Sequence, residues 1–477
     1  MSREGQVSGE RIREIEARSA EFRKELGLRD LVLTQIVYVV GSGWVGTAAL
    51  LGTAHVTFWL LAIALYYLPQ AAVVIYLNRQ MPLEGGLYQW ARVGFGEFGG
   101  FLTAWNLWAY TVVIMATFAV VIATNLSYLA GPAGAALTST WWYTPLVSTA
   151  TIAALTVVSV LGLRVGKWLQ SIGGAAHVLT FVALIAIPFI ALGRGKLDSY
   201  RPLAASVPAL SLLSLNIFGK MAMGALSGFE YVGILAGECR SPARTIGRSV
   251  VVAVPIIALM FILGTSSTLA LVPAGKIDLI SPIPQTLSIG FQGLGIASLI
   301  VPVLIVTLLL RQIGTVTLIF AGNTRLPMVA GWDGLLPRWF TRLHPRFRTP
   351  INSVVFVGAI TLALSLAGQV GVGLQESFQL LENAAGILYA FTYLSLFAIP
   401  IVAARRLAVR PPLWLRVAAL SGFAVTGLYA VLSIFPIIDV ASWQTFSTKI
   451  IAVLVATQAM GVALYAAGHR RARRAAV

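Results

Sequence analysis

Residues 250–263 read VVVAVPIIALMFIL, an apolar run without a charged side chain. A second run, residues 60–74, reads LLAIALYYLPQAAVV. Strands of a membrane barrel alternate polar and apolar residues, and these runs do not alternate. A helix needs about 20 apolar residues to cross a bilayer, and both runs lie inside longer apolar segments. The sequence therefore predicts α-helices that span a membrane.

The composition of the whole chain supports the same class. Of its 477 residues, 58% are hydrophobic and 11% are charged, and the mean hydropathy is +0.84. A soluble protein of this length needs more polar surface to cover its core. We expect an all-α polytopic membrane protein with twelve transmembrane helices, at residues 31–53, 55–79, 98–128, 141–162, 168–192, 209–238, 246–271, 294–325, 351–369, 374–404, 413–434 and 446–468.

The net charge of +17 predicts an orientation in the membrane. Most of the 34 Lys and Arg residues lie in the two terminal tails and in every second loop, whereas the alternate loops hold only Arg194, Lys196, Arg201, Lys276 and Lys449. Loops rich in Lys and Arg stay in the cytoplasm. We therefore expect both termini in the cytoplasm, a bacterial inner (plasma) membrane, the lipid bilayer as partner of the basic residues, and no nucleic acid.

Glycines cluster in the middle of two predicted spans. Gly41, Gly43 and Gly46 lie in the first span, and Gly224 and Gly228 lie in the sixth. Because the two spans are five apart, they cross the membrane in opposite directions, as in a five-plus-five inverted repeat with discontinuous helices 1 and 6. Glycine can also serve close helix packing. Two clusters in related positions favour unwound backbone around a ligand, with N–H groups for a carboxylate and carbonyls for an ammonium.

The sequence contains no convincing motif of an enzyme or of a cofactor site. Residues 41–46 match G-x-G-x-x-G, but they lie inside a span and the next acidic residue, Glu84, lies beyond another span. The chain has no Walker A motif and no identifiable pair of nucleophile and base. Its four histidines, His55, His177, His344 and His469, are scattered. We expect no catalytic activity, no cofactor and no metal site.

Four motifs follow one another along the chain: Gly41-Ser42-Gly43; Met81–Tyr88 (MPLEGGLY); Gly228-Phe229-Glu230 with Glu238 and Ser241–Arg244; and Asn323–Pro327 with Trp332–Pro337 and Arg348–Pro350. In this order they resemble motifs of the amino acid–polyamine–organocation superfamily, from its first-helix glycines to its eighth-helix R-D-G-x-x-P stretch. The arginine of that last motif is here Trp332. The resemblance covers the first ten spans.

The resemblance implies a secondary active transporter of amino acids or related amine-bearing solutes that works by alternating access. Its small-molecule substrate is then an amino acid or an amine. A polyamine or organocation carrier is an alternative, and so is a non-transporting sensor or channel on the same fold. The domains expected are an N-terminal tail (1–30), a transport core (31–404, with repeats 31–192 and 209–404), helices 11–12 (413–468) and a basic C-terminal tail (469–477).

The resemblance also places the substrate between the two glycine clusters. The residues expected to bind it are Gly41, Ser42, Gly43, Trp44, Gly224, Ser227, Gly228, Phe229 and Glu230. Family members often carry a bulky aromatic gate at the position of Gly224, and Trp44 is the candidate substitute. Glu230 either binds the amine of the substrate or ties off unwound backbone through a structural hydrogen bond.

Ionisable residues at membrane depth are functional by default. By the resemblance, His177 and Arg311 lie where sodium-dependent relatives bind the ion, so we expect sodium independence, with coupling to protons or exchange of substrates. His177 can change charge near neutral pH. Alternatively, His177 is a packing residue and Arg311 forms an ion pair with Glu230 or Glu382. Lys220 is expected to face the outer vestibule, either to steer substrate or to reach the interface.

The substitution Glu230→Gln tests the role of this carboxylate. If it contacts the amine, the loss of a charge-assisted hydrogen bond weakens binding of a zwitterionic or cationic ligand by roughly 1–3 kcal/mol. Transport by Glu230→Gln that equals the wild type at every pH would make Glu230 a structural residue.

Overall fold

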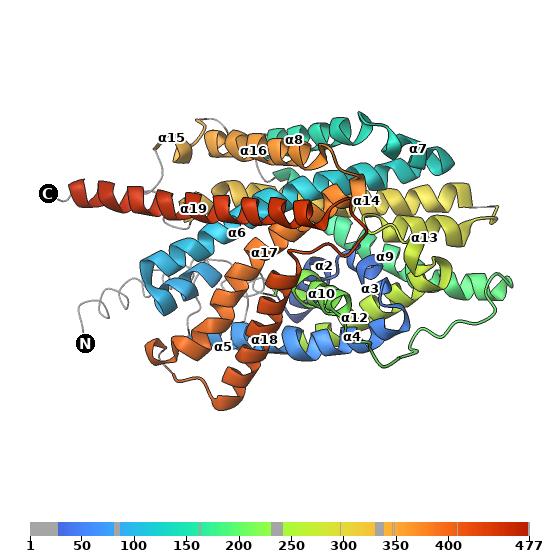
Figure 1. Cartoon of the computed structure of the whole chain (residues 1–477), viewed down its shortest axis with the longest axis horizontal. Coiled ribbons are helices and arrows are strands. Elements are labelled where there is room, and N and C mark those ends of the chain that lie inside the picture. The colour runs from blue at the N-terminus through green and yellow to red at the C-terminus, as the bar shows by residue number, and fades with distance from the viewer. Residues whose placement is uncertain are drawn as a thin grey trace.

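The structure is a computed structural model that describes residues 27–80, 86–161, 164–229, 242–295, 297–329, 338–345, 347, 349–407 and 409–475. Several sequence predictions lie outside these residues, among them Glu230, Glu238, Trp332 and most of the segment 81–88. The described part is helical without a strand. Figure 1 shows that most of the long helices run along the long axis of the molecule.

Nine spans in the described residues are long and apolar enough to cross a membrane. One joins α4 (His55–Ala62), η2 (Ile63–Tyr67) and α5 (Leu68–Gln80), and the other helices are α6 (Leu87–Ser127), α8 (Tyr143–Leu161), α12 (Pro242–Leu271), α14 (Ala297–Val329), α16 (Ile351–Gln369), α17 (Leu374–Val402), α18 (Leu413–Leu432) and α19 (Trp443–Ala475).

Three further predicted spans are present in other forms. The fifth is α9 (Arg164–Gly193). The first is broken into α2 (Leu28–Val39) and α3 (Trp44–Ala49). The sixth begins with α10 (Leu212–Gly219), which continues into the π-helical turn η4 (Lys220–Ala225), and its helix ends shortly after this turn. The prediction of twelve transmembrane helices, with helices 1 and 6 discontinuous at the glycine clusters, is confirmed.

The structure corrects the ends of several predicted spans. Helix α6 begins at Leu87, but Gly96 has a non-helical φ of 83° and divides it. The part after Gly96 agrees with the span predicted from residue 98, and the added first part carries the ion pair between Arg92 and Glu97. Helix α19 continues to Ala475, beyond the predicted end at residue 468. A further helix, α13 (Pro282–Phe291), lies in a predicted loop and is too short to cross a bilayer.

The helix pairs reproduce the relation between the two repeats. The third span packs on the tenth (α6 on α17), and the fifth packs on the eighth (α9 on α14). A shift by five spans turns the first pair into the second. The fourth and ninth spans (α8 and α16), which such a shift exchanges, pack on each other. The tertiary contacts therefore agree with the inverted repeat predicted from the glycine clusters.

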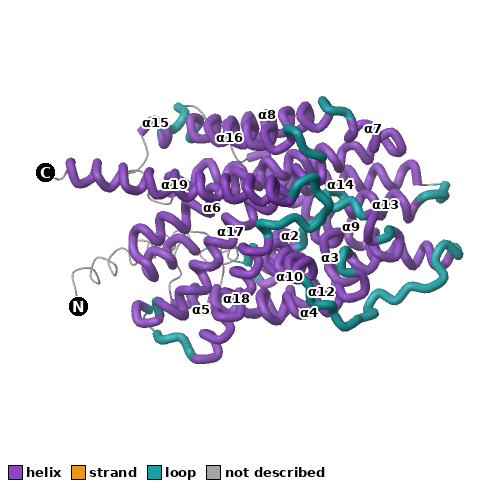
Figure 2. The backbone as a smooth tube through the Cα atoms, in the orientation of Figure 1, coloured by secondary structure: helices purple, strands orange, loops and turns teal. Residues whose placement is uncertain are grey.

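The segment between α9 and α10 runs along one end of the molecule as a long loop (Figure 2). Thr57 donates a hydrogen bond to the backbone oxygen of Ser206 at 2.9 Å, and Ser266 donates one to the backbone oxygen of Pro202 at 2.5 Å. These bonds join the link between the two repeats to α4 and α12.

Candidate functional site

A cavity of about 180 Å³ lies between the two broken helices. Helices α6, α14 and α17 complete its wall through Tyr110, Gln312 and Phe378, among others. Pockets for drug-sized ligands measure roughly 300–1,000 Å³, so this one suits a small solute. The predicted site residues that line it are Gly41, Ser42, Gly43, Trp44, Gly224, Ser227, Gly228 and Arg311.

Two other predicted site residues, Phe229 and His177, do not line the cavity. Phe229 is fully buried behind the break of helix six, with its ring 6.4 Å from that of Tyr67. His177 is fully buried and does not line the cavity. Glu230 follows Phe229 directly and lies outside the described residues. Most of the residues predicted at the two glycine clusters thus line one cavity together with Arg311, and His177 does not line it.

The break of the first helix covers Val40 to Gly43. Helix α2 ends with Val40 in an extended conformation, and α3 starts at Trp44. Among the described residues, none accepts a hydrogen bond from the N–H groups of Ser42 and Gly43. A Cβ atom on Gly43 would meet only the backbone oxygen of Leu279, at 3.8 Å. This backbone is therefore available to a ligand in the cavity.

The break of the sixth helix is held by side chains from two other spans. Gly228 has a φ of 112°, a conformation that favours glycine. Its N–H donates a hydrogen bond of 2.9 Å to the hydroxyl oxygen of Tyr393 on α17. The amide of Gln70 on α5, oriented to satisfy its neighbours, donates to the backbone oxygen of Leu226 at 3.1 Å and accepts from Phe229 N–H at 3.2 Å. Unwound backbone at membrane depth is thereby paired.

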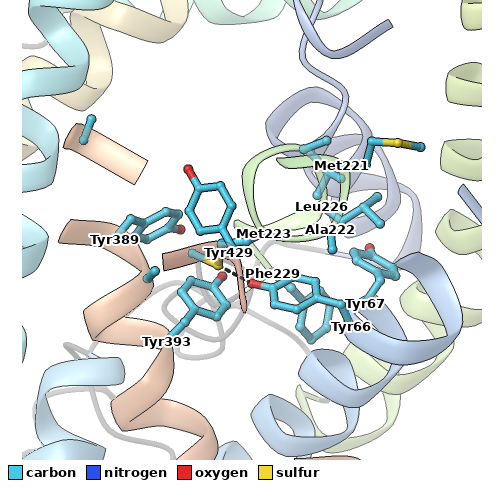
Figure 3. Packing of buried hydrophobic residues seen from close by; sticks show 14 of the residues in the cluster. Tyr66, Tyr67, Met221, Ala222, Met223, Leu226, Phe229, Tyr389, Tyr393 and Tyr429 are labelled. Atoms are coloured by element: carbon cyan, nitrogen blue, oxygen red, sulfur yellow. Dashed lines mark hydrogen bonds between the residues drawn. The ribbon is translucent and has the colours of Figure 1, made fainter. Parts of the chain in front are cut away.

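Figure 3 shows Tyr66 reaching this break from the neighbouring span. Its hydroxyl lies 2.6 Å from Ser227 Oγ and 2.9 Å from Met223 Sδ. Tyr66 belongs to the π-helical turn η2, and Met223 belongs to η4. Such wide turns occur frequently at functional sites. The two π-helical turns therefore face each other next to the cavity.

The indole of Trp44 lies between the two glycine clusters. A Cβ atom on Gly41 would come within 2.7 Å of Trp44 Cδ1, and one on Gly224 would come within 2.8 Å of Trp44 Cζ3. Since real Cβ contacts are not this short, both positions need glycine while the indole stays in place. The aromatic ring that the sequence lacks at Gly224 is thus replaced in space by a ring from the first helix.

Arg311 and His177 meet at the end of α2. Arg311 on α14 is buried, and its Nη2 donates a hydrogen bond of 3.0 Å to the backbone oxygen of Val40. His177 on α9 lies near the charge of Arg311 and near the backbone of Val40. The ion pair considered as an alternative for Arg311 stays a prediction: Glu382 lines the same cavity, and Glu230 lies outside the described residues. The spans that were expected to approach one another here do so.

The prediction for Lys220 is wrong. Its side chain is 1% exposed and donates a hydrogen bond to Asn383 Oδ1 on α17, so it neither faces a vestibule nor reaches the interface. The acidic group whose charge acts on Lys220 is Glu382, which lines the cavity. The sequence suggested Glu382 only as a partner of Arg311, although a carboxylate within a span is itself a signal of a functional site. Within the described residues, no three His, Cys, Asp or Glu side chains form a metal-binding group.

A cavity between two broken, repeat-related helices inside a bundle of apolar spans defines an integral membrane transporter. The family model described as "Amino acid permease" matches residues 26–457, and the chain belongs to this family.

The chain is also similar to individual transporters. It is 26% identical to an uncharacterized transporter of Legionella pneumophila over 79% of this chain and 80% of the relative. It is 24% identical to the human b(0,+)-type amino acid transporter 1 over 91% of this chain and 86% of the relative. The crystal structure of MhsT in complex with L-phenylalanine has the same fold, with a TM-score of 0.57, 15% identity, and coverage of 84% of this chain and 97% of that one.

Substitution of Gly224 tests the contact with Trp44. We expect Gly224→Ala to lower the stability of the purified protein by about 1–3 kcal/mol, because the new methyl group overlaps the indole. The same change in a Trp44→Leu background should cost much less. Gly427→Ala, which adds a methyl group in open space, is the matched control. Thermal unfolding in detergent measures these differences, and equal losses in both backgrounds would contradict the contact.

Proposed function

We propose that the chain is a secondary active transporter that carries amino acids or related amine-bearing solutes by alternating access. The observation that carries the proposal is the cavity bounded by both helix breaks. Broken helices at the interface of inverted repeats supply the substrate site in transporters of this architecture. The human relative is named an amino acid transporter, and the solved neighbour holds L-phenylalanine. Both names support a small amino acid-like substrate.

In this proposal the two breaks bind the two ends of a zwitterion. The N–H groups of Ser42 and Gly43 are hydrogen-bond donors for the carboxylate, and the backbone at Gly224–Gly228 supplies oxygens for the ammonium group. Gln70 and Tyr393 keep the second break in one conformation before the substrate arrives. Binding by groups that are already in place avoids the entropy cost of ordering them. Glu230 remains a proposed contact of the ammonium group, and Phe229, which is fully buried outside the cavity, is proposed to support the break.

Trp44 is the proposed gate over the substrate. Its ring lies on the cavity wall, against Gly224, where family members often carry an aromatic residue. A rotation of the indole away from Gly224 would open the cavity without any change in the backbone of helix six.

Sodium independence is proposed from the place of Arg311. Sodium prefers oxygen ligands, and the guanidinium already uses the backbone oxygen of Val40. A fixed positive charge about 4 Å from a sodium ion costs on the order of 4 kcal/mol at an effective dielectric constant of about 20. That cost lowers the affinity about a thousandfold. A sodium ion would therefore not stay beside Arg311.

His177 is the proposed carrier of a mobile charge. Arg311 cannot serve, because a guanidinium keeps its proton. In this structure His177 is fully buried near Arg311 and Val40, where a second positive charge is costly. Imidazole in water gains and loses a proton near neutral pH, so in this proposal His177 takes up its proton only when alternating access opens its surroundings to water. Proton coupling through His177 is thus one driving force for the transporter, and exchange of one substrate for another is the second.

Two other functions remain as candidates on the same fold. A polyamine or organocation carrier would use the same cavity and would bind ligands without a carboxylate. A sensor or channel would not saturate or show counterflow. Uptake by proteoliposomes as a function of substrate concentration, with counterflow, distinguishes a carrier from a sensor and from a channel.

The orientation is proposed from charge. The loops and tails predicted to face the cytoplasm hold most of the Lys and Arg residues, which supports cytoplasmic termini in a bacterial inner membrane. The cavity residues, from Val39 to Tyr389, all lie within residues 31–404, which supports this segment as the proposed transport core.

Replacing Gly43 by valine should abolish ligand binding and leave the fold intact. A Cβ atom there has room against the protein, so the added methyl groups extend into space that the proposed substrate needs. Gly322→Val, in open space away from the cavity, is the control. Ligand-induced thermal shifts with a panel of amino acids and amines measure binding. Unchanged affinity in Gly43→Val would remove the substrate from this break.

Uptake into proteoliposomes should persist when choline replaces sodium. With an imposed pH gradient, uptake should rise in the wild type and not in His177→Ala. A strict requirement for sodium would overturn the argument from Arg311. Uptake that ignores both sodium and pH, and is unchanged in His177→Ala, would refute proton coupling and support exchange.

A further inference from the structure

A second, smaller cavity of about 40 Å³ adjoins the first. Trp44, Tyr110, Gly224, Glu382 and Tyr389 line both cavities. Tyr429 on α18 lines only the smaller one. A ligand held at the two helix breaks can therefore extend a substituent into this side cavity.

Glu382 is the acidic group of the side cavity. It lies about two turns into α17, and no other acidic residue among those described lines either cavity. Its carboxylate makes no hydrogen bond or ion pair with another residue of the described part of the chain. A carboxylate at membrane depth needs a compensating charge, and the cavity gives a ligand access to it.

Two cations of the chain lie near this carboxylate. Lys220 supplies a counter-charge from helix six, but its Nζ bonds Asn383 Oδ1 and the residue lines neither cavity. Arg311 lines the larger cavity and is held by the Val40 oxygen. Neither cation lines the side cavity, so Glu382 faces it as the only charged group among the described residues.

Aromatic rings form the rest of the side cavity. The rings of Tyr110 and Tyr389 stack with centroids 4.1 Å apart and an interplanar angle of 4°. Figure 3 shows Tyr429 beside Tyr389, next to Met223. The Tyr429 hydroxyl packs directly on Gly386, where a side chain would displace it. Tyrosine and tryptophan rings around one carboxylate are the surroundings in which proteins bind ammonium groups.

The small volume restricts the group that enters. A ring does not fit in about 40 Å³, whereas a single ammonium group does. We infer that the side cavity formed by Glu382, Tyr110, Tyr389, Tyr429 and Trp44 binds the distal ammonium group of an amino acid with a cationic side chain. The inference rests on the proposed function, because the breaks must hold the α-amino and carboxylate groups.

Equilibrium binding of L-lysine and L-norleucine to the purified protein tests the inference. The two ligands have the same chain, and norleucine lacks the terminal amine. We expect the wild type to prefer lysine by roughly 10- to 100-fold, the range for a hydrogen bond to a charged group. Glu382→Gln should remove this preference and keep norleucine binding. Glu376→Gln, on the first turn of the same helix and away from both cavities, should keep it.

The outcomes distinguish a failure of the ammonium site in the side cavity from a failure of the proposed transport function. Equal binding of lysine and norleucine by the wild type, or an unchanged preference in Glu382→Gln, overturns the side cavity and leaves the proposed function. If Glu382→Gln does not fold, the wild-type comparison and Glu382→Asp, which withdraws the carboxylate by one methylene, still decide. If the wild type binds neither ligand nor any other amino acid, and Gly43→Val behaves like the wild type, the proposed function fails and the inference fails with it.

Discussion

Backbone N–H and C=O groups cannot remain unpaired inside a bilayer, and both broken helices of this transporter depend on that constraint. At helix six, Gln70 and Tyr393 pair the groups that unwinding releases around Gly228. At helix one, Arg311 pairs the oxygen of Val40. The side chains that stabilise the breaks come from α5, α14 and α17, so the geometry of the cavity is fixed by the bundle around it. Among the described residues, the N–H groups of Ser42 and Gly43 have no acceptor in the chain, so a ligand can bind to them.

The inverted repeat explains why the two breaks face each other. Helices α6 and α17 pack together as α9 and α14 do, and each pair joins one repeat to the other. Breaks at corresponding places in the two repeats are thereby brought to one cavity. The fit between the two breaks then depends on the volumes of the side chains that meet there. Trp44 fills the space that Gly224 leaves, and a side chain at Gly224 would exclude the indole.

Buried charge divides the cavity into two electrostatic regions. The Arg311 guanidinium lies at the break of helix one, and the Glu382 carboxylate lies toward α18 with Lys220 behind it. Val40 lowers the cost of burying Arg311, whereas Lys220 bonds Asn383 and only its charge reaches Glu382. A zwitterion with an additional ammonium group matches this arrangement, because its carboxylate and its cations meet regions of opposite sign.

The sequence determined the architecture by itself, because hydropathy and glycine spacing are properties of single helices. It predicted twelve spans, the two breaks, and the wall residues from Gly41 to Trp44 together with Gly224, Ser227 and Gly228, and the family motifs indicated the class. It did not predict helix α13, which is too short for a span, or the burial of Lys220 against Asn383. It also did not predict the side cavity around Glu382. Only the tertiary structure decided these features, because the distance between residues such as Trp44 and Gly224, or Lys220 and Asn383, depends on which faces of distant helices pack together.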